Sequence, residues 1–191
     1  MTASGLSSVE WIETIDGSHL VVREIRPSDS DALDAAFRKL SAESRYRRFL
    51  HPVKRLGQRD LNYLTHIDHV AHEALIALDL DEEIVGVARF VREDMRSVRA
   101  EVAVTVADAW QGRGVGTQLL HRLATRAREV GVETFAAICL ESNEEMLRLF
   151  RELGATTTRR SAGTADLEVE VALPADSPIH VFGAALKTAA S

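Results

Sequence analysis

Two features of this 191-residue chain carry residue types suited to chemistry, a carboxylate and the glycine-rich stretch that follows it. Glu101 opens the apolar run "VAVTV", and a carboxylate bordered by apolar side chains loses solvation, which makes it a stronger base. The run leads into "ADAWQGRGVGTQLL", where Gly112, Gly114 and Gly116 alternate with larger residues. Glycines leave main-chain N–H groups unobstructed, and a helix start adds about half a positive charge. The stretch therefore favours a phosphate or diphosphate, the alternative being a tight turn in which glycines only relieve strain.

The spacing excludes the two best-known phosphate loops. A Walker loop needs lysine and then serine or threonine after its last glycine, whereas Thr117 follows Gly116 directly. A dinucleotide fingerprint needs a further glycine three places on, where Thr117 or Leu119 stands. The preceding strands also read as antiparallel, whereas a dinucleotide-binding unit opens on a parallel sheet.

Hydrophobic periodicity predicts the elements that must position these residues. Strands are expected at 18–27, 72–80, 83–93, 99–107, 133–141, 155–162 and 165–173. Helices are expected at 28–40, 41–52, 58–67, 115–130 and 142–154. The strand, helix and strand over 99–141 imply a parallel pair. Ser142 and Glu145 have the spacing of a capping box, and the last two strands form a hairpin that turns near Gly163.

Composition bounds the class of protein. A net charge of −6 argues against nucleic acid as a partner. No apolar run reaches the ~18 residues of a membrane span, and the N-terminus does not read as a signal peptide. The single cysteine, Cys139, excludes an internal disulfide and fits a reducing cytoplasm. We therefore expect a soluble, cytoplasmic chain with one domain over 19–173, an N-terminal extension over 1–18 and a C-terminal tail over 174–191; the oligomeric state stays open.

The stretch Gln111–Gly116 resembles the Gln/Arg-x-x-Gly-x-Gly/Ala signature of the GNAT superfamily, the GCN5-related N-acetyltransferases. The predicted order of elements is similar to that family's fold over 19–173. The resemblance implies an α/β (α+β) fold with a mixed, mostly antiparallel central sheet and helices on both faces. "RPSDSDALDAAFRKLSAESRYRRF", "LTHID" and "IVGVARF" further resemble the acetyltransferase domain of bacterial protein-lysine acetyltransferases.

This resemblance implies an N-acetyltransferase that moves an acetyl group from acetyl-CoA, its co-substrate, to a primary amine by direct attack in a ternary complex. A protein lysine is the preferred acceptor; a small amine, such as a polyamine, amino acid or aminoglycoside, is the alternative. A lysine amine has a pKa near 10.4, so on the order of 0.1% is neutral at pH 7 and a base is needed. In the family the glutamate at the place of Glu101 is that base. The structural alternative for Glu101 is a cross-strand ion pair with Arg89.

The resemblance also implies the residues that hold the cofactor. Main-chain groups of Val104, Thr105 and Val106 would hold the pantetheine arm, and one of their amides would stabilise the oxyanion. The diphosphate would lie on the loop formed by Gln111, Gly112, Arg113, Gly114, Val115, Gly116 and Thr117.

Two further positions qualify this assignment. Asn143 would contact the pantetheine arm, cap the last helix, or do both. Phe150 stands at the cofactor where many family members carry a tyrosine that protonates the CoA thiolate. Because phenylalanine cannot donate a proton, a non-catalytic acyl-CoA sensor remains an alternative, as does a nucleotide-binding regulator.

The remaining features receive structural interpretations. His66, His69 and His72 are spaced three apart but match no metal-binding pattern, so no metal site is predicted. Cys139 lies in an apolar strand and is expected to be inert. The run "RYRRF" (Arg45–Phe49) is expected to be a solvated helix face, with a wall of the acceptor cleft as the alternative.

Overall fold

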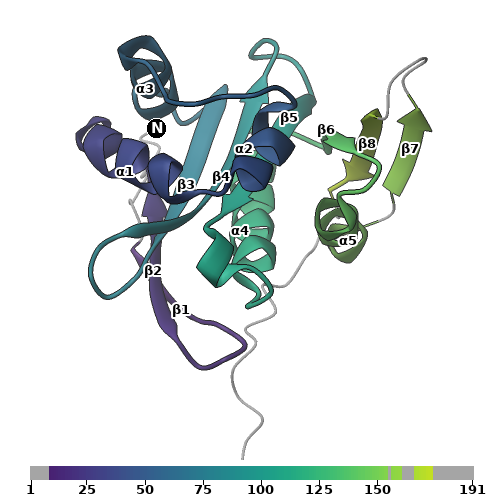
Figure 1. The fold of residues 1–191 in the computed structure, drawn as a ribbon. Helices are drawn as coiled ribbons and strands as arrows, with labels where there is room; N and C mark the ends of the chain where they lie inside the picture. Colours follow the sequence, from purple (N-terminus) through teal and green to yellow (C-terminus); the bar gives the residue numbers. More distant parts are fainter. Residues whose placement is uncertain (1–8, 155, 161–165, 174–191) are drawn as a thin grey trace, which may run out of the picture.

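The computed structural model describes residues 9–154, 156–160 and 166–173, which build one eight-stranded mixed sheet (Figure 1). The strand order is β1-β2-β3-β4-β5-β6-β8-β7, and every neighbouring pair is antiparallel except β5 with β6. The strands are β1 (Glu10–Glu13), β2 (His19–Glu24), β3 (His72–Leu78), β4 (Ile84–Arg92), β5 (Arg99–Val106), β6 (Thr134–Leu140), β7 (Thr156–Arg160) and β8 (Asp166–Ala172). The helices are α1 (Ser30–Lys39), α2 (Ala42–Phe49), α3 (Gln58–Thr65), α4 (Val115–Glu129) and α5 (Glu144–Leu153), with short 3-10 turns η1 (Pro27–Asp29) and η2 (Asp108–Trp110).

Helices cover both faces of the sheet because strand side chains alternate between two cores. On β3, Leu75 and Ala77 belong to the larger core, which α4 and α5 share. Ala74 and Ile76 belong to the smaller core, which lies under α1 and α3. The short helix α2 contacts β5 and β6. The predicted fold class, a mixed and mostly antiparallel sheet with helices on both faces, is confirmed.

The sheet begins earlier than the sequence pattern indicates. Glu10–Glu13, inside the extension expected over 1–18, form β1 and pair with β2. Of these residues only Ile12 is buried, so the strand has too little apolar alternation to be predicted. The first eight residues of the chain, the tail over 174–191 and the hairpin turn near Gly163 lie outside the described residues.

The parallel pair in the sheet is short. β5 pairs with β6 only from Arg99 to Glu101, opposite Thr134–Ala136, whereas β5 stays paired with β4 as far as Val106. Parallel strands need a crossover connection, and α4 supplies it. Beyond Glu101 the two strands separate, which leaves a gap between β6 and the second half of β5.

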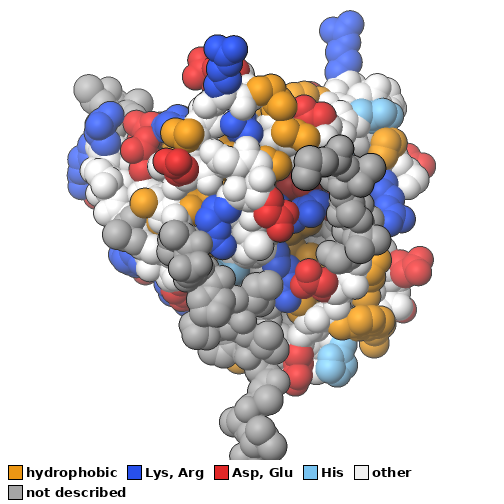
Figure 2. Space-filling model, turned by 180° about the vertical axis from the view of Figure 1, so that it is seen from behind, with side chains coloured by type: hydrophobic (Ala, Val, Ile, Leu, Met, Phe, Trp, Pro, Cys, Tyr) orange, Lys and Arg blue, Asp and Glu red, His pale blue; other side chains and the backbone are white. Residues whose placement is uncertain are grey.

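The surface mixes charges of both signs. Figure 2 shows Lys and Arg side chains interspersed with Asp and Glu over the face seen from behind. Cross-strand ion pairs, such as that of Arg99 with Glu168 and Glu170, join opposite charges on the sheet. Across the described ranges, no helix has both the length and the apolar character that a membrane crossing requires.

The packing of α4 gives a stability prediction. Leu123 is fully buried at 0% exposure, whereas Leu80 is 74% exposed. Leu123→Ala should lower the free energy of unfolding by about 2–5 kcal/mol, because it leaves a cavity between α4 and the sheet. The matched change Leu80→Ala should alter it by less than about 0.5 kcal/mol. Urea denaturation of both variants checks this, and equal losses would contradict the packing described here.

Candidate active site

A cleft of about 280 Å³ lies where β5 and β6 separate. One wall is β5 from Glu101 to Val106, and the facing wall is β6 from Ala137 to Cys139. Gly112 and Gly114–Thr117 of the glycine loop line it as well, and side chains of α2 and α5 complete the lining. The fold thus brings the predicted residues of β5, the loop and the start of α5 to one place.

The main chain of β5 presents amides to this cleft. The Ala107 N–H donates to the Val85 carbonyl beside β4 over 2.8 Å, and hydrogen-bonding directions alternate along a strand. The N–H groups of Val104 and Val106 therefore face away from β4, toward the gap, whereas that of Val102 belongs to the last residue pair with β6. Their side chains pack in or against the core under α4. An extended chain laid in the gap can pair with these amides as an added strand would.

The glycine loop holds two residues in the left-handed backbone region. Gly112 has φ 72° and Gly114 has φ 84°, values at which residues with a side chain are strained. Helix α4 begins directly after Gly114, so its first N–H groups and the positive end of its dipole open on the cleft. A Cβ at Gly116 would lie 3.4 Å from Leu149 of α5, so a larger residue would crowd the cleft. This geometry suits an anion.

A hydrogen-bonded network ties α2 to the loop. Asp108 accepts hydrogen bonds from the Ser41 and Ser44 hydroxyls, each at 2.7 Å. The Gln111 side-chain amide donates to the Ser44 hydroxyl at 3.2 Å and to the Val106 carbonyl at 3.0 Å. Gln111 therefore braces loop, strand and helix together. Sequence reasoning missed Ser44, because its partners lie more than sixty residues away along the chain.

Two residues expected at the cofactor, Arg113 and Phe150, do not line this cleft. The Arg113 guanidinium pairs with Asp16 at 2.9 Å and stacks over the Trp110 ring at 4.9 Å, and Arg113 is not a lining residue of the cleft. The Ile15 N–H donates to the Arg113 carbonyl at 3.0 Å, so the turn after β1 holds this residue outward. Phe150 is wholly buried in the larger core and does not line the cleft either.

Asn143 precedes α5 and lines the cleft. Its Oδ1 accepts a hydrogen bond from the Met146 N–H at 3.2 Å, so Asn143 caps the helix and the capping box predicted from Ser142 to Glu145 is wrong. Cys139 is buried on β6, and burial raises the pKa of its thiol. A thiol of raised pKa stays protonated at neutral pH, which suits the inert role expected of it.

Glu101 stands at the last residue pair between β5 and β6, where the cleft opens. Its side chain is exposed, so the loss of solvation expected from its apolar neighbours is wrong. The alternative interpretation, an ion pair with Arg89, is also wrong. Arg89 pairs across the sheet with Ala103, and its guanidinium donates to the Leu64 carbonyl and to His72 instead. Within the described ranges the Glu101 carboxylate forms no ion pair.

A cationic group lies beside Glu101. Arg48 of α2 is half-buried, lines the cleft and stacks over the Phe49 ring at 4.8 Å. Burial lowers the pKa of Arg48, and the Glu101 carboxylate opposes that shift. Burial first, and then the charge of Arg48, lower the pKa of Arg89 to about 9. The run Arg45–Phe49 is therefore partly a wall of the cleft rather than only a solvated face. The density of arginines in this run was visible in the sequence. The sequence did not indicate which of these arginines points into the cleft.

The three histidines spaced three apart do not gather. Only His69 joins a group of possible metal ligands, with Glu24 and Glu73, whose ligand atoms lie within 4.8 Å of one another. The Arg126 guanidinium lies among them, ion-paired with Glu24 and 3.6 Å from a Glu73 carboxylate oxygen. A cation of the protein itself thus balances these acids, and the expected absence of a metal stays a prediction.

Comparison with known sequences agrees with this geometry. The chain matches the Acetyltransferase (GNAT) family over residues 35–155. It is 33% identical over 161 residues to Acetyltransferase Pat of Mycolicibacterium smegmatis, covering 84% of this chain and 48% of that protein. It is 30% identical over 159 residues to Acetyltransferase PA5475 of Pseudomonas aeruginosa, covering 80% and 85%. The chain thus spans about half the length of the first relative.

Solved structures share the fold. The GNAT domain of S. lividans PAT superposes with a TM-score of 0.80 at 33% identity, covering 86% of this chain and 97% of that one. A cAMP-binding acyltransferase from Mycobacterium smegmatis gives a TM-score of 0.64 at 29% identity, covering 93% and 50%. The chain belongs to the acetyltransferase (GNAT) family, and the resemblance drawn from its sequence is confirmed.

The buried histidine that contacts Arg89, His72, gives a pH prediction. Burial and the Arg89 charge lower the pKa of His72 from 6.5 to about 4, so the unfolded chain binds this proton more readily than the folded one. The free energy of unfolding should therefore fall as the pH drops below 6.5, by about 2 kcal/mol at pH 5 from this group. Urea denaturation at pH 7 and pH 5 should show that His72→Gln removes this part of the loss. The exposed His19→Gln should keep it; if both variants behave like wild type, His72 is not the group responsible.

Proposed function

We propose that this chain transfers an acetyl group from acetyl-CoA to a primary amine, with a protein lysine as the preferred acceptor. The supporting observation is one cleft that joins an anion-binding loop, a row of strand amides and the Glu101 carboxylate. Five residue steps separate Glu101 from Val106, about 16 Å of strand, which suits an extended thioester arm. Membership of the GNAT family, and relatives that are named acetyltransferases, support acetyl-CoA as the donor.

The donor would bind mainly through the backbone. The N–H groups at the start of α4 and in the loop would hold the diphosphate, with Gly112 and Gly114 permitting its close approach. The pantetheine arm would lie along Val104–Val106 and pair with the amides that face the gap. Asn143, whose Oδ1 caps α5, keeps its side-chain N–H₂ for the arm.

In the proposed reaction the amine attacks the thioester carbonyl within a ternary complex. Glu101 accepts the proton from the nitrogen, directly or through one water, because a protonated amine has no lone pair. The C–N bond forms, a β5 amide such as that of Val104 stabilises the oxyanion, and the C–S bond then breaks. Phe150 is buried and carries no donor, so the sulfur leaves as a thiolate and takes its proton from water.

The preference for a protein lysine rests on sequence similarity to bacterial protein-lysine acetyltransferases. A small amine is the alternative acceptor. A non-catalytic acyl-CoA sensor is the second candidate function, which the phenylalanine at position 150 favours. Acceptor-dependent release of the CoA thiol separates the transferase from the sensor, since a sensor would bind acetyl-CoA without cleaving its thioester. The single cysteine of the chain supports the cytoplasm as its location.

Replacement of the base tests the mechanism. Glu101→Gln keeps the size of the side chain but cannot accept the amine proton, so kcat should fall by about 100-fold or more. Affinity for acetyl-CoA, measured by isothermal titration calorimetry, should stay within about twofold of wild type. Glu93→Gln removes an exposed carboxylate outside the cleft and should leave both values unchanged. Full turnover by Glu101→Gln would rule out this residue as the base.

The diphosphate contact can be tested by shortening the ligand. S-acetyl-pantetheine keeps the thioester and the arm but lacks the diphosphate, and two lost charge-assisted hydrogen bonds correspond to about 100-fold weaker binding. Gly114→Ala should reduce the difference in affinity between acetyl-CoA and S-acetyl-pantetheine, because it disturbs the loop that holds the diphosphate. Alanine is strained at φ 84°, and its Cβ would lie 3.2 Å from Ile15. Competition binding against acetyl-CoA provides the measurement. Equal affinity for both thioesters would place the diphosphate outside the loop.

A further inference from the structure

A second cavity, of about 60 Å³, adjoins the cleft on the face of the sheet covered by α1. Arg48, Phe49 and Thr105 line both cavities, so the two meet at the wall formed by α2 and β5. The rest of the lining is mostly apolar and comes largely from α1 and β4. One other charged residue lines it, Arg89.

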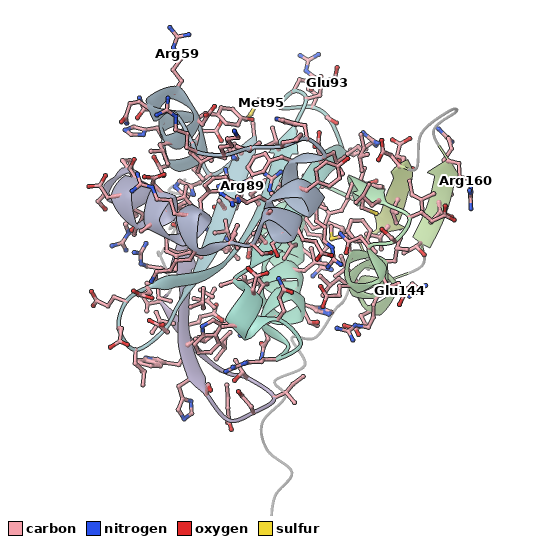
Figure 3. All side chains as sticks on the ribbon, in the orientation of Figure 1. Arg59, Arg89, Glu93, Met95, Glu144 and Arg160 are labelled. Carbon is pink, nitrogen blue, oxygen red and sulfur yellow. The ribbon has the colours of Figure 1, made fainter. Side chains whose placement is uncertain are left out.

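Arg89 carries a buried charge that no carboxylate of the described residues balances at ion-pair distance. It is 5% exposed, and Figure 3 shows it in the interior of the molecule, whereas Arg59 and Arg160 point outward. Its two terminal nitrogens donate to the Leu64 carbonyl at 3.3 Å, and one of them also lies 3.1 Å from His72 Nε2. Throughout the described part of the chain, neither this guanidinium nor that of Arg48 has a carboxylate within ion-pair distance.

Two other largely buried arginines of this chain have stronger or more numerous hydrogen-bond partners than Arg89. Arg23, also largely buried, forms two hydrogen bonds of 2.7 Å with Asp29. Arg92, 7% exposed, donates to three main-chain carbonyls and lines neither cavity. Arg89 has one carbonyl and a neutral imidazole instead, and it lines the same cavity as a second cation, Arg48. A buried cation without a counter-charge is costly, so this site favours an anion that arrives from outside.

We propose that the second cavity is a subsite for a carboxylate carried by the acceptor, bound between Arg48 and Arg89 while the acceptor amine reaches Glu101. This inference rests on the proposed function, since it concerns the acceptor side of the same cleft. The carboxylate balances the two guanidinium charges, the Thr105 hydroxyl offers it a further donor, and the apolar lining takes the methylene groups beside it. The group has two sources, the α-carboxylate of a free amino acid or an Asp or Glu side chain next to a lysine in a protein.

Binding of a minimal probe tests the subsite without turnover. Propionate carries the carboxylate and a short apolar chain, and propionamide is its neutral counterpart. In the presence of CoA, propionate should bind at least about tenfold more tightly than propionamide, measured by calorimetry, because a charge-assisted contact is lost with the amide. Arg48→Gln should remove that difference, and Arg48→Lys should keep part of it. Arg59→Gln, an exposed arginine on α3 that lines neither cavity, is the control.

Matched acceptors test the role in catalysis. kcat/KM should be about tenfold higher for free lysine than for lysinamide if the source is an amino acid. It should be about tenfold higher for a Lys-Glu peptide than for a Lys-Gln peptide if the source is a protein side chain. Equal values within both pairs, together with equal binding of the two probes, would overturn the subsite even if Arg48→Gln failed to fold, since both comparisons use the wild-type chain. Propionate binding without CoA release from any acceptor would instead overturn the proposed transferase function and leave the carboxylate site standing.

Discussion

The separation of β5 from β6 after Glu101 is the constraint on which the rest of the structure depends. Had the parallel pairing continued, the amides of Val104 and Val106 would bond to β6 and the cleft would close. Because it stops after three residue pairs, a row of main-chain groups faces a gap with a carboxylate at one end. The glycine loop lies at the other end for the same topological reason, since the crossover helix must start where β5 stops.

This arrangement needs rigid support, because an open gap within a sheet forfeits hydrogen bonds that a continuous sheet would form. The larger core supplies that support by packing α4 and α5 against strands on either side of the gap. The loop is held from outside by the Ile15–Arg113 backbone bond and from inside by Gln111. Asp108, with Ser41 and Ser44, fixes α2 to the same point, so the wall that carries Arg48 is positioned by the loop it faces.

The sequence indicates the features that depend on local pattern, and misses those that depend on contacts between distant segments. The order of strands and helices follows from periodicity, and the anion loop follows from glycine spacing beside a helix start. Strand β1 could not be predicted from the sequence, because it is a strand through its pairing with β2 and not through its own hydrophobic pattern. The exposure of Glu101 and the burial of Arg89 also depend on contacts between distant segments. Both are set by helices from another part of the chain, which cover Arg89 and leave Glu101 exposed. The expectations for Arg113 and Asn143 follow from their positions in motifs. The orientation of their side chains depends instead on their partners, Asp16 for Arg113 and the Met146 N–H for Asn143.

The geometry of β5 separates two tasks within one strand. At Val104 and Val106 the backbone faces the gap and the side chain faces the core, so recognition of a donor there would tolerate many apolar side chains. At Glu101, Ala103 and Thr105 the side chain points to the opposite face of the sheet, and Thr105 reaches the second cavity, so these positions are open to chemistry. Binding of the donor would therefore depend on the backbone arrangement of the fold, and binding of the acceptor on the side chains that the sequence supplies. A positive field from Arg48 beside Glu101 fits this division, because it disfavours an ammonium ion near the base and favours the neutral amine that attack requires.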